Sequence, residues 1–332
     1  MNYKQLKYSV DEVNELLSTI ENNKECISKF KPKFGASPYF AEAKDLNGNV
    51  TIYTEEARKQ LITNYSLYGI KEYPIIIHIS YNEDTGEFYI VEDLSIIKNV
   101  IEHGIGLGVY PICIKMHAQR YNETHIDNYG HSGFYEKWLG FIDELVETFK
   151  EYDSIEYLTV HNEVGYLYGS DAHEQFVLDC LNKAREYGYK TGVTCAGFSN
   201  FIEIKESVIN NSDTIFINHY QPISDKGKLT TKRDSILAWQ SDIYNWINYM
   251  KKYNKPLIIS ETGVQNNWYA LSNPGRWSWT EISYSADAVG IYLYGLLETL
   301  KECEDIERVW WWYDVVSYEC CQKILKEYLK GE

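Results

Sequence analysis

Two glutamates that follow apolar, β-branched runs are the residues of this chain best suited to chemistry. The run 157–161 reads Tyr-Leu-Thr-Val-His and is followed by Asn162-Glu163; the run 256–260 reads Pro-Leu-Ile-Ile-Ser and is followed by Glu261. A carboxylate at the end of a buried strand is costly in a core and useful in an active site. Two carboxyl groups that flank one glycosidic bond can break it, one as nucleophile and one as proton donor. The pair predicts sugar chemistry, whereas either glutamate alone could equally cap a helix or pair with a surface lysine.

A repeated pattern of short β-rich runs and helical stretches surrounds these glutamates. Strands are expected at 34–37, 73–79, 109–117, 155–161, 191–195, 214–218, 256–260 and 308–312. Helices are expected at 11–29, 54–68, 92–103, 133–152, 171–187, 199–210, 235–253, 281–302 and 318–330, with a polar loop at 118–132 and an aromatic loop at 264–280.

Eight strand–helix units with near-continuous apolar strands predict an α/β fold, the (β/α)8 TIM barrel. We expect one domain over residues 1–332, with an N-terminal helix ahead of the barrel. The alternative is a doubly wound open sheet, which usually has fewer strands. The chain shows no glycine-rich phosphate loop of the kind that such sheets often carry.

In a barrel of this kind the site lies at the C-terminal ends of the strands. The polar and aromatic residues at those ends are therefore the candidate site residues: His78, Ser80, Lys115, His117, Asn162, Glu163, His219, Tyr220, Glu261, Trp312, Tyr313 and Asp314. These side chains meet at one end of the barrel only if the barrel prediction holds.

The chain resembles the clan A glycoside hydrolases, also called the 4/7 superfamily, in which Asn-Glu ends the fourth strand and Glu ends the seventh. Asn162-Glu163 and Ser260-Glu261 stand at those places, and Lys115-Met116-His117 is similar to the pattern of family 113 mannanases, so families 5 and 113 look nearest. The resemblance implies that Glu163 is the general acid/base, that Glu261 is the nucleophile and that Asn162 binds the sugar 2-hydroxyl. It implies no cofactor.

The same resemblance suggests further substrate-binding residues. Tyr220 would hydrogen-bond the nucleophile, and Trp312 would form the floor of the subsite that holds the cleaved sugar. His117 ends its strand and could contact a hydroxyl. His219 is a candidate as well, although strand alternation turns it away from Tyr220 and a buried structural histidine is equally compatible.

Trp268 and Trp277 lie in the aromatic loop at 264–280. Exposed tryptophans are expensive unless something covers them, so we interpret these two as platforms for sugar rings. The alternative is local packing within the loop.

Composition excludes several other classes of function. The net charge of −16 disfavours nucleic acid and anionic membranes as partners, and no apolar run approaches the ~20 residues of a membrane helix. The seven cysteines include no C-x-x-C pair, and no His/Asp cluster suggests a metal. The 30 tyrosines and nine tryptophans favour a carbohydrate partner. Reduced thiols suggest a cytosolic protein, but a secreted chain whose signal peptide has been removed would look the same.

These observations predict a retaining β-glycosidase that acts on an oligo- or polysaccharide. A transglycosylase with the same two glutamates and a catalytically inactive carbohydrate-binding barrel are the alternatives; a barrel that uses metal or phosphate lacks the motifs. The sugar, the choice between endo and exo action and the oligomeric state are not predicted.

Overall fold

The structure is a computed structural model that describes residues 30–38, 43–44, 50–51, 54–82, 84–118, 133–163, 171, 173–197, 201–225, 228–276, 283–301 and 303–329. The helix expected at 11–29, nearly all of the loop expected at 118–132 and the last part of the aromatic loop lie outside the described residues.

Nine strand segments form one parallel sheet, in the order β8-β7-β6-β4-β1-β12-β11-β10-β9. Their bounds are β1 (Lys33–Ala36), β4 (Glu72–Asn82), β6 (Tyr110–Ala118), β7 (Tyr157–Thr159), β8 (Lys190–Gly192), β9 (Thr194–Ala196), β10 (Ile215–Asn218), β11 (Leu257–Thr262) and β12 (Ile306–Trp311). Only Val193 separates β8 from β9, so the two ends of the sheet belong to one stretch of chain and the sheet closes on itself. Counted this way, the described residues supply the eight strand positions of the predicted barrel.

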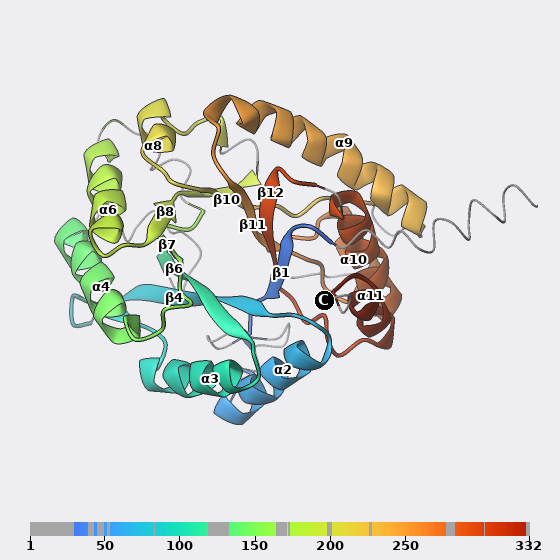
Figure 1. The fold of residues 1–332 in the computed structure, drawn as a ribbon, viewed down its shortest axis with the longest axis horizontal. Helices are drawn as coiled ribbons and strands as arrows, with labels where there is room; N and C mark the ends of the chain where they lie inside the picture. Colours follow the sequence, from blue (N-terminus) through green and yellow to red (C-terminus); the bar gives the residue numbers. More distant parts are fainter. Residues whose placement is uncertain are drawn as a thin grey trace, which may run out of the picture.

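Helices surround this sheet on its outer side (Figure 1). They are α2 (Glu55–Leu67), α3 (Leu94–Gly106), α4 (Phe134–Phe149), α6 (Glu174–Glu186), α8 (Glu206–Asn210), α9 (Lys232–Met250), α10 (Ala286–Leu300) and α11 (Glu319–Leu329), with short 3-10 turns η2 (Lys251–Tyr253) and η3 (Trp268–Ser272). The predicted TIM barrel is thus confirmed. None of the helices in the described part of the chain is long and apolar enough to span a membrane.

Side-chain periodicity and capping explain these helices. In α4, Trp138, Ile142, Leu145 and Phe149 are fully buried and recur at helical spacing, so one stripe faces the sheet. Helix α9 begins at a capping box in which Thr231 and Asp234 satisfy each other's backbone N–H groups. Burial of the apolar stripes against the sheet holds the helices in the ring that Figure 1 shows.

The apolar interior has two parts. A large cluster fills the space between the sheet and the helices. A second, small cluster lies inside the barrel and consists of Ile112, Cys113, Tyr157, Phe216, Ile258 and Trp310. These inner residues mark which face of β7, β10, β11 and β12 points inward and so fix the direction of the side chains further along each strand. On β6 the register against β4 shifts at Ile112, and the alternation that continues to the end of the strand starts from Cys113.

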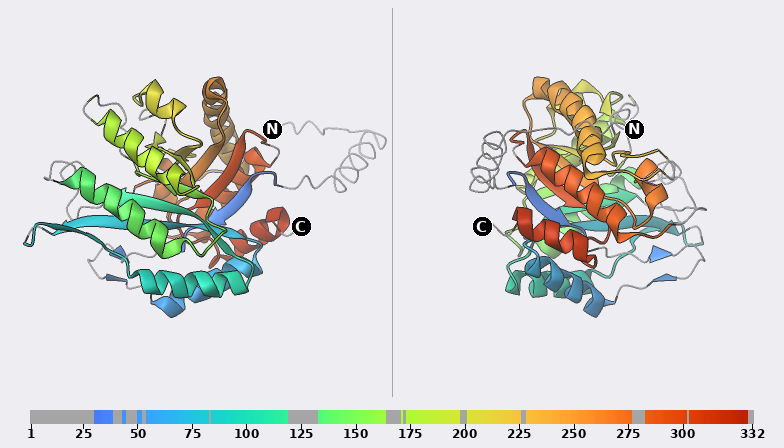
Figure 2. Two further views of the ribbon diagram at one scale, coloured as in Figure 1. Left: turned by 60° about the vertical axis from the view of Figure 1, so that its left-hand side comes forward. Right: turned by 90° about the vertical axis from the view of Figure 1, so that its right-hand side faces the viewer.

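Two strand pairs were not predicted. Strand β5 (Glu87–Ile90) pairs antiparallel with the end of β4, and β2 (Ala43–Lys44) pairs with β3 (Val50–Thr51). The β4–β5 hairpin turns at Gly86, whose φ of 72° suits glycine. The hairpin extends beyond the barrel at the end where the parallel strands terminate (Figure 2). We call that end the mouth.

Candidate active site

Strand alternation directs two polar side chains from the inner cluster toward the mouth. On β6, Lys115 follows the inward-facing Cys113 by two residues, and on β10, Asn218 follows the inward-facing Phe216 by two. Both side chains therefore lie inside the barrel, one layer above the apolar cluster. Lys115 is fully buried and Asn218 is 2% exposed.

An irregularity in strand register brings two successive residues of β11 into the same interior. The pairing between β10 and β11 shifts after Ile217, so that Asn218 lies opposite Glu261. A bulge of this kind breaks the alternation and can turn neighbouring side chains toward one side. Ser260 Oγ accordingly donates to Asn218 Oδ1 at 2.8 Å, while the next residue, Glu261, also makes its contacts inside the barrel.

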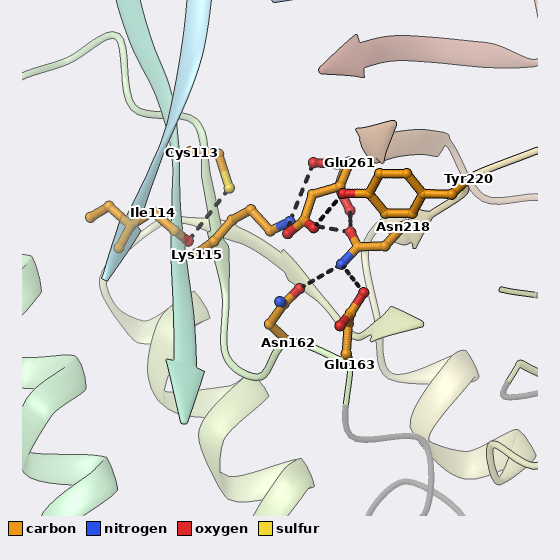
Figure 3. Close-up of polar contacts among 9 residues, drawn as sticks. Cys113, Ile114, Lys115, Asn162, Glu163, Asn218, Tyr220 and Glu261 are labelled. Carbon is orange, nitrogen blue, oxygen red and sulfur yellow. Dashed lines mark hydrogen bonds and ion pairs between the residues drawn. The ribbon is translucent and has the colours of Figure 1, made fainter. Parts of the chain in front are cut away.

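Glu261 is held by partners at both carboxylate oxygens (Figure 3). Lys115 Nζ donates to Oε1 at 2.6 Å, and the Tyr220 hydroxyl donates to Oε2 at 3.1 Å. The ammonium group of Lys115 also donates to the Ser260 carbonyl at 3.2 Å and to Asn218 Oδ1 at 3.3 Å. A buried carboxylate with a cation and a hydroxyl in place has little freedom to rotate.

The second glutamate reaches the interior by a turn at the end of β7. The His161 ring points outward and stacks on Trp138 of α4, with ring centroids 5.0 Å apart and planes 13° from parallel. Burial lowers the pKa of His161 to about 3, so this ring is neutral at ordinary pH. The chain then turns inward. The Glu163 backbone N–H donates to the Thr194 carbonyl at 3.2 Å, on the neighbouring barrel strand.

Glu163 has an unusual backbone conformation. Its φ is +57°, a left-handed value that is uncommon for residues other than glycine and that tends to persist where function requires it. Asn218 Nδ2 holds the side chain, donating to Glu163 Oε1 at 2.8 Å and to Asn162 Oδ1 at 3.1 Å (Figure 3). Because Asn218 Oδ1 also accepts from Ser260 Oγ, one amide connects residues at the ends of the fourth and seventh barrel strands.

The two glutamates differ in their electrostatic surroundings. Burial and then the charge of Glu261 raise the pKa of Glu163 to about 7, while the hydrogen bond from Asn218 and the charge of Lys115 act in the opposite direction. Burial, again with the charge of Glu261, raises the pKa of Tyr220 well above its usual value, so Tyr220 remains a hydrogen-bond donor. A carboxylic acid and a carboxylate side by side are the arrangement that acid-assisted nucleophilic chemistry needs.

The structure brings four of the predicted site residues together: Asn162, Glu163, Tyr220 and Glu261. It adds two that were given no role from sequence. Lys115 was noted only as a polar strand-end residue and as part of the Lys115-Met116-His117 pattern, and Asn218 only as the last residue of the strand expected at 214–218. The available signal was a lysine and an asparagine at inward positions of otherwise apolar strands.

His117 lies at the mouth on the same inward face of β6 as Lys115. It pairs in register with His78 of β4, and the two ring centroids are 5.1 Å apart. Glu92, which follows the β4–β5 hairpin, accepts from the His78 backbone N–H at 2.8 Å and contacts His78 Nδ1 at 2.5 Å. The two imidazoles therefore form part of one wall of the mouth.

The His219 backbone N–H donates to the Glu261 carbonyl at 2.8 Å, but its side chain is directed away from the two carboxyl groups. Its ring packs against Trp239 and Trp246 of α9, and its Nε2 lies 3.1 Å from Asp242 Oδ2 on the same helix. Strand alternation accounts for this outward direction, because Asn218 on one side and Tyr220 on the other point inward.

The tryptophans have different surroundings. Trp310 belongs to the inner cluster, whereas Trp311 points outward and packs against Tyr292 of α10. Trp312 follows the end of β12, is 8% exposed and donates its backbone N–H to the Thr262 carbonyl at 2.8 Å. Trp268 lies in η3, partly buried and packed against the outer core. Trp277 lies outside the described residues.

No group of three or more histidine, cysteine, aspartate or glutamate side chains that could hold a metal ion occurs within the described ranges. The cluster at the mouth consists instead of two carboxyl groups, one ammonium group, two amides and a phenol. Such groups can transfer protons, attack an electrophilic carbon and hydrogen-bond hydroxyl groups.

The closed parallel barrel is the fold of the clan A glycoside hydrolases, in agreement with the resemblance seen in the sequence. Among solved structures, a GH113 β-1,4-mannanase superposes with a TM-score of 0.69 at 14% identity, over 92% of this chain and 100% of that chain. The GH113 β-mannanase of Alicyclobacillus acidocaldarius in complex with ManMIm gives 0.68 at 11% identity, over 92% and 98%.

A fungal β-1,4-galactanase gives a TM-score of 0.51 at 10% identity, over 85% of this chain and 89% of that chain. No protein-family model matches the chain, and no curated protein matches it by sequence. The similarity to known proteins is therefore one of fold, and the case for chemistry depends on the residues at the mouth.

Proposed function

We propose that the protein is a retaining β-glycosidase that cleaves an oligo- or polysaccharide. The observation that carries this proposal is the unequal pair of carboxyl groups at the mouth. Glu163 has its pKa raised to about 7 and can donate a proton near neutral pH, while Glu261 is held by the Lys115 ammonium group and the Tyr220 hydroxyl. This is the division of roles that double displacement requires.

In the first step a Glu261 oxygen attacks the anomeric carbon and the glycosidic C–O bond breaks. Its electron pair goes to the leaving oxygen, which takes the proton from Glu163. In the second step the ionised Glu163 takes a proton from water, and the water oxygen bonds to the anomeric carbon. The ester C–O bond breaks as this new bond forms, and its electron pair returns to Glu261.

The surrounding residues have roles that fit this cycle. Asn162 is placed beside Glu163 by Asn218 and would bind the hydroxyl next to the anomeric carbon. Tyr220 would orient Glu261. His117 and Trp312 would contact the bound sugar from the walls of the mouth, and Trp268 and Trp277 would extend the platform along the loop.

The substrate class is proposed from the same chemistry and from the neighbours in fold. Hydroxyl-rich sugars suit a mouth of amide, phenol and imidazole groups with aromatic walls. Of the proteins with a similar fold described above, one is a β-1,4-mannanase, one a β-mannanase and one a β-1,4-galactanase. We therefore place β-linked mannan and galactan first in a substrate screen.

The test is a screen of aryl β-glycosides and polysaccharides, followed by proton NMR of the first product anomer. We expect hydrolysis with retention of the β configuration, and loss of activity in Glu163→Gln and Glu261→Gln. An α anomer as the first-formed product would contradict the double-displacement mechanism. Absence of turnover with every glycoside would contradict the proposal that the protein is a glycosidase. Transfer to an added acceptor sugar in place of hydrolysis would identify a transglycosylase instead.

A further inference from the structure

Lys115 is fully buried, and within the described residues its ammonium group hydrogen-bonds only to the site. Its ammonium group donates to the Glu261 carboxylate, to the Ser260 carbonyl and to the Asn218 amide oxygen (Figure 3). A fully buried lysine is rare and is normally found only with a paired charge. Here the paired charge is the carboxylate that the proposed reaction consumes.

Formation of the glycosyl ester changes the charge balance around Lys115. Before the first step Glu261 is anionic and its charge opposes that of the ammonium group, 2.6 Å away. In the ester Glu261 is neutral, and Lys115 is left as a buried cation without its partner. The cost of such an unpaired charge is large, and it is relieved in two ways: by release of the Glu261 carboxylate or by ionisation of another group nearby.

Asn218 provides the geometric link to that other group. Its amide oxygen accepts from Lys115 and its amide nitrogen donates to Glu163, so the two residues bind opposite ends of one side chain. The charge of Lys115 already favours the ionised form of Glu163 in the free protein. Esterification of Glu261 removes the opposing negative charge and leaves only this influence.

We propose that Lys115 is the residue that drives the second half of the reaction, in which the glycosyl ester is hydrolysed. It stabilises the carboxylate of Glu261 as the leaving group, and it favours the ionised form of Glu163 that removes a proton from water. Lys115 acts through these two glutamates and not on the sugar, so it is a positioning residue. The inference rests on the proposed function.

If the Lys115–Glu261 ion pair served only to stabilise the fold, a different result would be expected. Buried pairs can often be replaced by apolar residues with little loss, and a lysine that only packs would affect both steps alike. The contacts of Lys115 argue against a purely structural role. Its side chain extends from β6 across the barrel interior and hydrogen-bonds to residues of β10 and β11. These strands are not neighbours of β6 in the sheet.

The test separates the two steps with dinitrophenyl β-glycosides, whose good leaving group makes the first step fast. The variants are Lys115→Met and Lys115→Gln, which remove the charge; the glutamine variant keeps a donor and serves if the methionine variant does not fold. We expect deglycosylation to slow by about a hundredfold or more and the first step by less than about tenfold. The readout is a burst of dinitrophenol near one equivalent per protein, with the glycosyl-enzyme visible by intact-mass spectrometry.

Two controls accompany these variants. Lys115→Arg keeps the charge and should retain most of the wild-type deglycosylation rate. Lys59→Met removes a lysine that pairs with Glu55 at the same 2.6 Å on helix α2, outside the sheet, and should leave both steps unchanged. The pH profile of kcat/KM gives a further measurement. In Lys115→Met and Lys115→Gln the alkaline decline of kcat/KM should move to higher pH by about one pH unit, because the positive charge that lowers the Glu163 pKa is gone.

The outcomes distinguish this inference from the proposed function. Equal slowing of both steps with no burst and an unmoved alkaline limb would show that Lys115 is structural, while the glycosidase proposal would stand. A wild-type chain that hydrolyses no glycoside and forms no glycosyl-enzyme would overturn both.

Discussion

The side-chain amide of Asn218 donates a hydrogen bond to Glu163, 2.8 Å from Nδ2 to Oε1. Through its oxygen the same amide contacts the lysine that holds Glu261, so one residue of β10 links the ends of β7 and β11. The relation explains how two glutamates distant in sequence share one electrostatic environment. It also supplies specific expectations for single substitutions.

Removal of the nucleophile should abolish turnover and allow chemical rescue. For Glu261→Ala we expect kcat to fall by at least about a thousandfold, because no group remains to form the ester. Added azide should fit the space left by the carboxylate and restore part of the rate, with an α-glycosyl azide as product. Product analysis by NMR checks this. Full activity of the variant, or a β-glycosyl azide, would contradict the assignment of Glu261.

Removal of the proton donor should depend on the leaving group. In Glu163→Ala, aryl glycosides with acidic phenols need no protonation of the leaving oxygen, so their first step should change little. Glycosides of weakly acidic alcohols should lose about a hundredfold or more in kcat/KM. The measurement is kcat/KM across a series of phenols. A uniform loss over the whole series would count against an acid/base role for Glu163.

The activity should fall in alkaline solution with an inflection set by Glu163. Its pKa of about 7 means that kcat/KM declines above about pH 7, as the acid loses its proton. The hydrogen bond from Asn218 lowers that pKa, so Asn218→Ala should move the inflection to higher pH. pH profiles of wild type and variant check this; a shift to lower pH in Asn218→Ala would refute the electrostatic description.

The raised pKa of Glu163 should also cost stability. The folded-state value of about 7 lies above the ordinary 4.5, so between these values the folded chain binds more protons than the unfolded chain, and stability falls as pH rises. Glu163→Gln removes this cost. We expect its thermal midpoint to exceed that of wild type by roughly 2–5 °C at pH 8, with the difference vanishing near pH 4.

Differential scanning calorimetry of both chains at the two pH values checks this expectation. The matched control is Glu203→Gln, which replaces an exposed glutamate in the loop before α8 and should show no such gain. A stability gain for Glu163→Gln that is equally large at pH 4 and pH 8 would show that ionisation of Glu163 is not its cause.

Much of the fold could be predicted because buried parallel strands leave a strong pattern in the sequence. Runs such as 73–79 and 256–260 are almost wholly apolar, and each is followed by a helical stripe, so all eight barrel positions were found. The broken strand at Val193 and the antiparallel β5 were missed. Glu87–Ile90 alternates between more and less exposed residues, and the turn before it determines its pairing.

The candidate site could be predicted only in part. Glu163 and Glu261 stand out because an acidic residue directly after an apolar strand run is unusual. Lys115 and Asn218 do not, because their importance lies in which residues they meet across the barrel, and this depends on strand register and on the shift after Ile217. Sequence periodicity indicates that a side chain points inward but not which partner it finds.

Labelling of the nucleophile tests the central claim most directly. The reagent is a dinitrophenyl β-glycoside with fluorine in place of the hydroxyl next to the anomeric carbon, which slows release of the sugar more than its attachment. Peptide mapping by mass spectrometry should find one fluorosugar per chain, bound to Glu261 on the peptide that contains β11. A label on another residue, or hydrolysis of natural substrates by a chain that never takes the label, would contradict the account.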